Sequence, residues 1–216
     1  MFIFVSGGTR SGKSEWAERA AVALSSDTPR VYLATAQVSD EDMRRRVARH
    51  QAARKDRGFL TLERTRDLSG IFPNIPSDAT VLLECLPNWL ANEMFTGDGS
   101  VCDPALLEEN IFQTALALKE RCRHLLIVSD DIFSDGVTYT FDAGEVPPAP
   151  PELHAAYISP VVGPPPPPDD LTESYRRLLG RLHVRLAGAA DVAVECVAGL
   201  VRWAKGEMGF DFPSLL

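Results

Sequence analysis

Short apolar runs alternate along the chain with longer segments whose apolar residues recur at helical spacing. The apolar runs predict strands at 1–5, 30–36, 59–63, 79–85, 124–131 and 191–197, with a hairpin partner at 200–203. Helical periodicity predicts helices that begin near residue 15 and that cover 39–55, 88–95, 104–122 and 170–186. Such alternation indicates an α/β fold, in which helices flank a mostly parallel sheet with an antiparallel hairpin at one edge.

A glycine-rich turn lies between the first predicted strand and the first predicted helix. Its residues match the phosphate-loop pattern G-x-x-x-x-G-K-[ST] and are Gly7, Gly8, Thr9, Arg10, Ser11, Gly12, Lys13 and Ser14. Glycines let backbone N–H groups turn toward a polyphosphate, Lys13 adds a positive charge, and the Ser14 hydroxyl is a Mg²⁺ ligand. The sequence therefore predicts a site for a nucleotide with Mg²⁺. A glycine-rich turn that binds nothing is the disfavoured alternative.

The predicted helix at 39–55 carries a basic face. Arg46, His50 and Arg54 stand four residues apart and therefore share one side of the helix. Positive potential from the arginines favours the neutral imidazole, which is a nucleophile, and the arginines could hold a phosphate beside it. On spacing alone, however, a solvated basic face without chemistry is the favoured interpretation.

Acidic residues end several predicted strands. Glu84 ends one strand, and Asp130 with Asp131 ends another, so either strand could orient Mg²⁺ in a phosphate-loop protein. Glu63 follows a third strand. For each of these carboxylates, a structural role such as capping the next turn is an equal alternative.

Composition limits the class of protein. A chain of 216 residues with 45% hydrophobic content predicts a single nucleotide-binding domain over 1–216. A net charge of −8 argues against a surface that binds nucleic acid through bulk charge. The sequence has no signal-peptide pattern and no apolar run long enough for a membrane span. Four cysteines without C-x-x-C spacing are typical of reduced thiols, so we expect a cytoplasmic protein.

A proline-rich insertion at about 133–170 interrupts the alternation. Ten of the sixteen prolines lie between Pro147 and Pro168, and the run 164–168 excludes helix and central strand. We interpret the insertion as a surface excursion or lid. No other candidate site residue lies at a motif-like spacing from His154 in this insertion, so we expect His154 to be an exposed loop histidine.

Several segments together resemble the adenosylcobinamide kinase and adenosylcobinamide-phosphate guanylyltransferase family of cobalamin biosynthesis. The resemblance covers most of 1–129 and 171–205, in the order SGGTRSGKSEWAERA, YLATA, EDMRRRVARHQAAR, LTLER, VLLECLPNWLANEMF and RLAGAADVAVECVAGL. It implies a RecA-like phosphate-loop fold and a homotrimer. It also implies two reactions, phosphorylation of a corrinoid, adenosylcobinamide, and transfer of GMP from GTP to the resulting phosphate through a guanylyl-histidine.

The resemblance also implies site residues. His50 would be the nucleophile, which reverses its interpretation from spacing, and Lys13 would assist catalysis. The implied nucleotide contacts, for GTP and ATP with Mg²⁺ on Ser14, are Gly7 to Ser14, Ala34, Thr35, Ala36, Gln51, Ala52, Ala53, Arg54, Glu63 and Glu84. A carboxylate can accept both N1–H and N2–H of guanine, so Glu63 or Glu84 could read the base.

This chain departs from the family pattern in two places. Ser129-Asp130-Asp131 and the insertion replace a T/S-N-E strand end and a short turn, and Pro87 replaces a common Thr. Two other functions therefore stay open. One is a phosphate-loop small-molecule kinase in which His50 is only a basic-face residue. The other is a nucleotide-binding regulatory protein without turnover.

Overall fold

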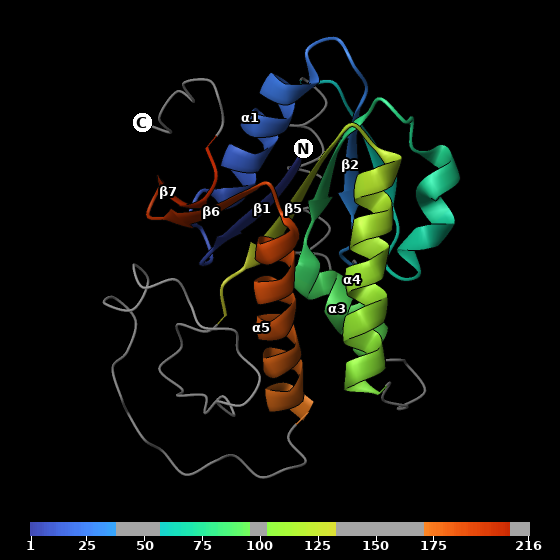
Figure 1. Cartoon of the computed structure of the whole chain (residues 1–216), viewed down its shortest axis with the longest axis vertical. Helices are drawn as coiled ribbons and strands as arrows, with labels where there is room; N and C mark the ends of the chain where they lie inside the picture. Colours follow the sequence, from blue (N-terminus) through green and yellow to red (C-terminus); the bar gives the residue numbers. More distant parts are fainter. Residues whose placement is uncertain (38–56, 96–102, 133–170, 208–216) are drawn as a thin grey trace.

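A seven-stranded sheet forms the centre of the computed structural model, which describes residues 1–37, 57–95, 103–132 and 171–207 (Figure 1). The strand order is β3-β2-β4-β5-β1-β6-β7, and every neighbouring pair is parallel except the antiparallel pair β6 and β7. The strands are β1 (Phe2–Gly7), β2 (Arg30–Ala34), β3 (Phe59–Glu63), β4 (Thr80–Glu84), β5 (His124–Asp130), β6 (Val192–Val197) and β7 (Leu200–Lys205). This order confirms the predicted α/β class, a mostly parallel sheet with an antiparallel hairpin at one edge.

Helices cover the two faces of the sheet unequally. One face packs on α1 (Lys13–Ser25), which follows the glycine-rich turn directly. The opposite face packs on α3 (Leu86–Met94), α4 (Pro104–Arg121), α5 (Leu171–Ala189) and the 3₁₀ helix η1 (Leu68–Asn74). Figure 1 shows α4 and α5 running side by side over this second face. None of the helices described is long and apolar enough to cross a membrane.

Strand β5 shows why the strands of this sheet are continuous apolar runs in the sequence. Leu125 and Ile127 belong to the core under α3, α4 and α5, whereas Leu126 and Val128 belong to the core under α1. A strand that is buried on both faces is apolar at successive positions, and polar residues appear only where the strand ends. Asp130 continues the side that faces α1, and Ser129 continues the side that faces α5.

An ionic cluster joins α4 to α5 at the surface. The Glu108 carboxylate accepts hydrogen bonds from Arg181 Nε at 2.6 Å and from Arg185 Nη1 at 3.1 Å. Arg185 also reaches Glu109, at 2.7 Å, and its guanidinium lies 3.9 Å from the centre of the Phe112 ring. Glu108 is only 13% exposed, so it is the shared anchor of the two helices.

The predicted element bounds agree with the structure to within a few residues for every described strand and for α3, α4 and α5. The sequence did not predict η1, whose segment contains Gly70 and Pro73 and has no helical period. The helix expected at 39–55 and the proline-rich insertion at about 133–170, with His154, lie outside the described residues. All described strands belong to one sheet, and the single domain over 1–216 stays a prediction.

Candidate nucleotide-binding site

The turn between β1 and α1 has a backbone that requires glycine. Gly12 has φ +91° and Arg10 has φ +61°, which turns the chain sharply before α1 begins. A Cβ on Gly7 would lie 2.5 Å from the carbonyl oxygen of Cys196 and 2.6 Å from Ser11 Oγ. Gly7 therefore lets β6 and the turn approach each other closely, as a phosphate cradle requires.

Lys13 begins α1 and points back across the turn. Its ammonium group lies 2.5 Å from Asp130 Oδ1 and donates a hydrogen bond to the carbonyl of Gly8 at 3.3 Å. The lysine is buried, with 8% of the residue exposed. Asp130 reaches it because β5 lies next to β1, with Gly7 and Asp130 in register. The strand order thus brings a positive charge and a carboxylate to the same point.

Ser14 faces a second carboxylate. Its hydroxyl donates to Glu84 Oε1 at 2.5 Å, and the hydroxyl of Tyr32 donates to Glu84 Oε2 at 3.0 Å. Glu84 is the last residue of β4, and Tyr32 lies on β2, the neighbouring strand. Hydroxyl and carboxylate oxygens side by side are the hard ligands that Mg²⁺ prefers.

The strands β3, β2, β4 and β5 are parallel neighbours, so their carboxyl ends lie at the same end of the sheet. The predicted acids are located at this end. Ala34 is in register with Glu63 on one side and with Glu84 on the other, so the three residues form one row. Glu63 is exposed, whereas Glu84 is half-buried against the turn. Ligands of open parallel sheets bind beyond these strand ends, where the sequence predicted the site.

The cradle includes a buried polar atom without a partner. Ser11 Oγ finds no hydrogen-bond partner among the described residues, although Ser11 is only 6% exposed. The main chain of Ser11 is held from both sides, because its N–H donates to Gly8 O and its carbonyl accepts from Gly199 N–H. A phosphate oxygen is an acceptor that would satisfy this hydroxyl, so the turn fits a polyphosphate.

Thr35, one of the predicted nucleotide contacts, is hydrogen-bonded to the main chain that follows β4, and its role toward a ligand stays a prediction. Its side chain is fully buried, and its hydroxyl is hydrogen-bonded to both the N–H and the carbonyl of Cys85, each at 2.8 Å. Ala34 and Ala36 flank it at the edge of the sheet. His50, Gln51, Ala52, Ala53 and Arg54 lie outside the described residues, so their roles stay predictions.

The described cysteines are inert thiols. Burial raises the pKa of Cys85 to about 12 and that of Cys196 to about 11, so both are protonated at neutral pH. Cys122 is buried as well, and these three cysteines are free of disulfides. Although Cys85 and Cys196 lie next to the turn, neither is a nucleophile there.

His183 was not singled out by sequence reasoning. It lies on α5 and shares a 2.6 Å hydrogen bond with Ser129 Oγ, while its ring packs edge-on against Phe4. Burial lowers its pKa to about 4, although Asp130 and Asp131 oppose the shift. A single histidine in a helix of mixed charge gives no sequence signal for such a contact. The neutral imidazole fixes β5 one residue before Asp130.

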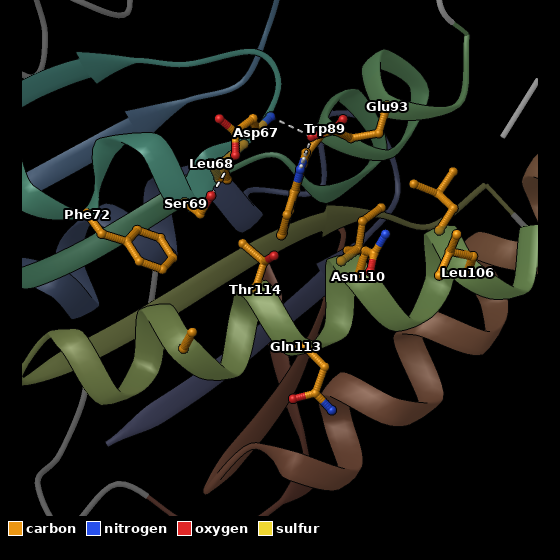
Figure 2. A pocket seen from close by; sticks show the side chains of 13 residues that line it. Asp67, Leu68, Ser69, Phe72, Trp89, Glu93, Leu106, Asn110, Gln113 and Thr114 are labelled. Carbon is orange, nitrogen blue, oxygen red and sulfur yellow. Dashed lines mark hydrogen bonds between the residues drawn. The ribbon is translucent and has the colours of Figure 1, made fainter. Parts of the chain in front are cut away.

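A cavity of about 540 Å³ lies between η1, α3 and α4 (Figure 2). Leu68, Phe72 and Trp89 supply apolar lining, and Asp67 and Glu93 lie at its side. Glu93 accepts hydrogen bonds from Asp67 N–H at 2.7 Å and from Trp89 Nε1 at 3.2 Å. This cavity opens on the face of the sheet opposite α1, so it is separate from the nucleotide site.

The mostly parallel sheet and the turn between β1 and α1 define a phosphate-loop nucleotide-binding protein of the α/β class. The chain belongs to the family described as cobinamide kinase / cobinamide phosphate guanyltransferase (CobU), whose family model matches residues 3–143. It is 30% identical to the bifunctional adenosylcobalamin biosynthesis protein CobU of Salmonella typhimurium, over 93% of this chain and 97% of that one. The protein of the same name from Escherichia coli is 29% identical over the same shares.

Among solved structures, the chain is similar to an ATPase domain. That match has a TM-score of 0.41 and 14% sequence identity, and covers 90% of this chain and 68% of the other.

Proposed function

We propose that this enzyme phosphorylates adenosylcobinamide and then transfers GMP from GTP to the resulting adenosylcobinamide phosphate. One observation carries the proposal: Lys13 points back across the phosphate loop, and the Ser14 hydroxyl faces the Glu84 carboxylate at the end of β4. In phosphate-loop enzymes, such residues position a nucleoside triphosphate and its Mg²⁺. Family membership supplies the acceptor class, a corrinoid.

The phosphates would lie on the turn from Gly7 to Gly12. Its backbone N–H groups and the start of α1 favour negative charge, and Lys13 adds its ammonium group. Ser14 and Glu84 are the residues that would hold Mg²⁺, which neutralises phosphate charge when bound. In the described part of the chain, no group of three or more His, Cys, Asp or Glu could hold a metal. Mg²⁺ suits two protein oxygens, because it completes its shell with water and phosphate.

In the guanylyl step, His50 is the proposed nucleophile. A lone pair of its neutral imidazole forms a bond to the α-phosphorus of GTP, the bond to the β-phosphate oxygen breaks, and pyrophosphate leaves. The ring loses its remaining N–H proton to the surroundings. A phosphate oxygen of the corrinoid then attacks the same phosphorus, the P–N bond breaks, and His50 regains a proton. Two displacements let one nucleotide site serve two acceptors.

Glu63 is the better candidate for reading guanine. Both oxygens of Glu84 already accept hydrogen bonds, from Ser14 and Tyr32, which supports a role beside the metal. Glu63 lies in the same row, is exposed, and can present its carboxylate to adjacent N–H donors of the base. The use of ATP and GTP, the homotrimer and the cytoplasmic location belong to this proposal through the family.

Intact mass after incubation with GTP and Mg²⁺ tests the proposal. We expect an adduct of about 345 Da, the mass that one guanylyl group adds to a histidine. The linkage should be labile in acid and stable in alkali. His50→Ala should abolish it, and His154→Ala, a matched control, should keep it.

Assays of corrinoid phosphorylation with ATP and of pyrophosphate release separate the two other functions. A small-molecule kinase would phosphorylate the corrinoid with ATP but form no adduct with GTP. A regulatory protein would bind nucleotide without phosphorylating the corrinoid or releasing pyrophosphate. Either result would contradict the proposed guanylyl transfer.

A further inference from the structure

Thr35 forms hydrogen bonds that join the end of β2 to the end of β4. Beyond the last ladder pair, its N–H donates to the carbonyl of Glu84 at 3.1 Å. Its hydroxyl donates to the carbonyl of Cys85 and accepts from Cys85 N–H, both at 2.8 Å. Three hydrogen bonds from one fully buried residue therefore fix the main chain from which the Glu84 side chain extends.

Tyr32 fixes the other end of that side chain. Its hydroxyl donates to Glu84 Oε2 at 3.0 Å, and its ring packs edge-on against Phe59 at 6.3 Å between centroids. The tyrosine is 6% exposed, so it has little freedom to move away. Glu84 Oε1 is left on the side of Ser14, whose hydroxyl lies 2.5 Å away. Backbone and carboxylate are thus both constrained.

Asn92 extends the same network into α3. Its side-chain amide donates to the carbonyl of Thr35 at 2.7 Å and to that of Thr65 at 3.0 Å. The main chain of Thr35 is therefore held by a helix on the opposite face of the sheet. The Glu84 carboxylate has support from β2 and α3 before any ligand binds.

We infer that Thr35 and Tyr32 are positioning residues, which hold the Glu84 carboxylate beside Ser14 Oγ so that the two oxygens form one preformed metal site. The inference rests on the proposed role of Ser14 and Glu84 toward Mg²⁺. It assigns Thr35 an indirect role, since its buried hydroxyl is already committed to Cys85. A preformed site loses less conformational freedom on binding, so its loss should weaken Mg²⁺-dependent binding in particular.

Calorimetric titration with GTP, in excess EDTA and at several Mg²⁺ concentrations, tests this inference. Thr35→Val leaves the buried N–H and carbonyl of Cys85 without their partner. We expect it to reduce the Mg²⁺-dependent gain in GTP affinity by roughly tenfold, while the affinity in EDTA stays within about twofold. Thr35→Ser retains the hydroxyl and should restore the gain.

Thr80→Val is the matched control. Thr80 is also fully buried and lies on β4, but at the opposite end, where its Oγ1 has no hydrogen-bond partner within the described ranges. Its substitution removes the same hydroxyl without breaking a described hydrogen bond, so Mg²⁺-dependent binding should match that of the unsubstituted enzyme. A folded Thr35→Val protein with the full Mg²⁺-dependent gain would overturn the inference.

Tyr32→Phe decides the question if Thr35→Val does not fold. It removes one hydrogen bond to Glu84 and keeps the aromatic contact with Phe59, and we expect a roughly threefold loss of the Mg²⁺-dependent gain. An unchanged gain in Tyr32→Phe would overturn the inference in that case. Absence of any Mg²⁺-dependent gain in the unsubstituted enzyme would instead overturn the proposed function, and the inference with it.

Discussion

Lys13 Nζ lies 2.5 Å from Asp130 Oδ1, so the lysine of the phosphate loop is paired with the last residue of the neighbouring strand β5. The lysine side chain is 10% exposed and that of the aspartate 35%, so solvent screens the pair only in part. A nucleotide phosphate needs the same ammonium group. Asp130 therefore competes with the ligand for Lys13.

Substitution of Asp130 should relieve this competition. We expect Asp130→Asn to raise the affinity for GTP in EDTA by roughly three- to tenfold, because a negative charge beside the phosphates is removed. Calorimetry or equilibrium dialysis measures this affinity for GTP. Asp78→Asn changes the net charge equally at an exposed site before β4 and should leave the affinity unchanged. A fall in affinity for Asp130→Asn would mean that Asp130 orients Lys13 for binding.

Gly7 and Gly8 should respond differently to alanine. A Cβ at Gly7 would lie 2.5 Å from Cys196 O, whereas a Cβ at Gly8 meets no atom of the described chain within 4 Å. We expect Gly7→Ala to lower the free energy of unfolding by about 2 kcal/mol or more, and Gly8→Ala by less than about 1 kcal/mol. Urea unfolding monitored by circular dichroism gives both values. Equal losses would show that β6 can move away from the turn.

Acid should destabilise the fold through His183. Its pKa is about 4 in the folded protein against 6.5 for the ordinary group, so the unfolded chain binds the proton more tightly. The contribution of neutral His183 is complete above pH 6.5 and is lost as the pH falls toward 4, by about 3 kcal/mol in all. His183→Gln should unfold with a shallower dependence on pH over this range in urea titrations. A parallel dependence would contradict the burial argument.

Glu108 should matter more for stability than its neighbour. Glu108 is 13% exposed and holds two arginines of α5, while Glu109 is 50% exposed and holds one. We expect Glu108→Gln to cost about 1 to 2 kcal/mol of unfolding free energy and Glu109→Gln to cost less than Glu108→Gln. Thermal and urea unfolding of the two variants make the comparison. Similar costs would mean that solvent screens both carboxylates alike.

The phosphate loop was predictable because its signal is local. Gly7, Gly12, Lys13 and Ser14 lie within eight consecutive residues, and the flanking strand and helix have their own patterns. Glu84 and Asp130 were recognised as candidates, but their partners were not. Which acid faces Ser14 and which faces Lys13 depends on the strand order β4-β5-β1, and this order comes from pairing between distant segments.

Residues that act through side-chain contacts were the hardest to foresee. The Tyr32 hydroxyl, the Thr35 hydroxyl and His183 occupy positions that a pattern of hydrophobicity assigns to core or to helix surface. Their partners Glu84, Cys85 and Ser129 lie about fifty residues away along the chain. A polar group in a buried strand has to find such a partner, but the sequence alone does not name it.

β1 is an interior strand of the sheet, and both of its neighbours come later in the chain. Its neighbours begin at His124 and Val192, so β1 leaves the ribosome long before either partner exists. Gly199 then supplies the N–H that holds Ser11. A nascent chain that ends before the β6–β7 turn has the nucleotide-binding motif but lacks this hydrogen bond to Ser11. The main-chain contacts of the turn are therefore complete only after the β6–β7 turn has been synthesised.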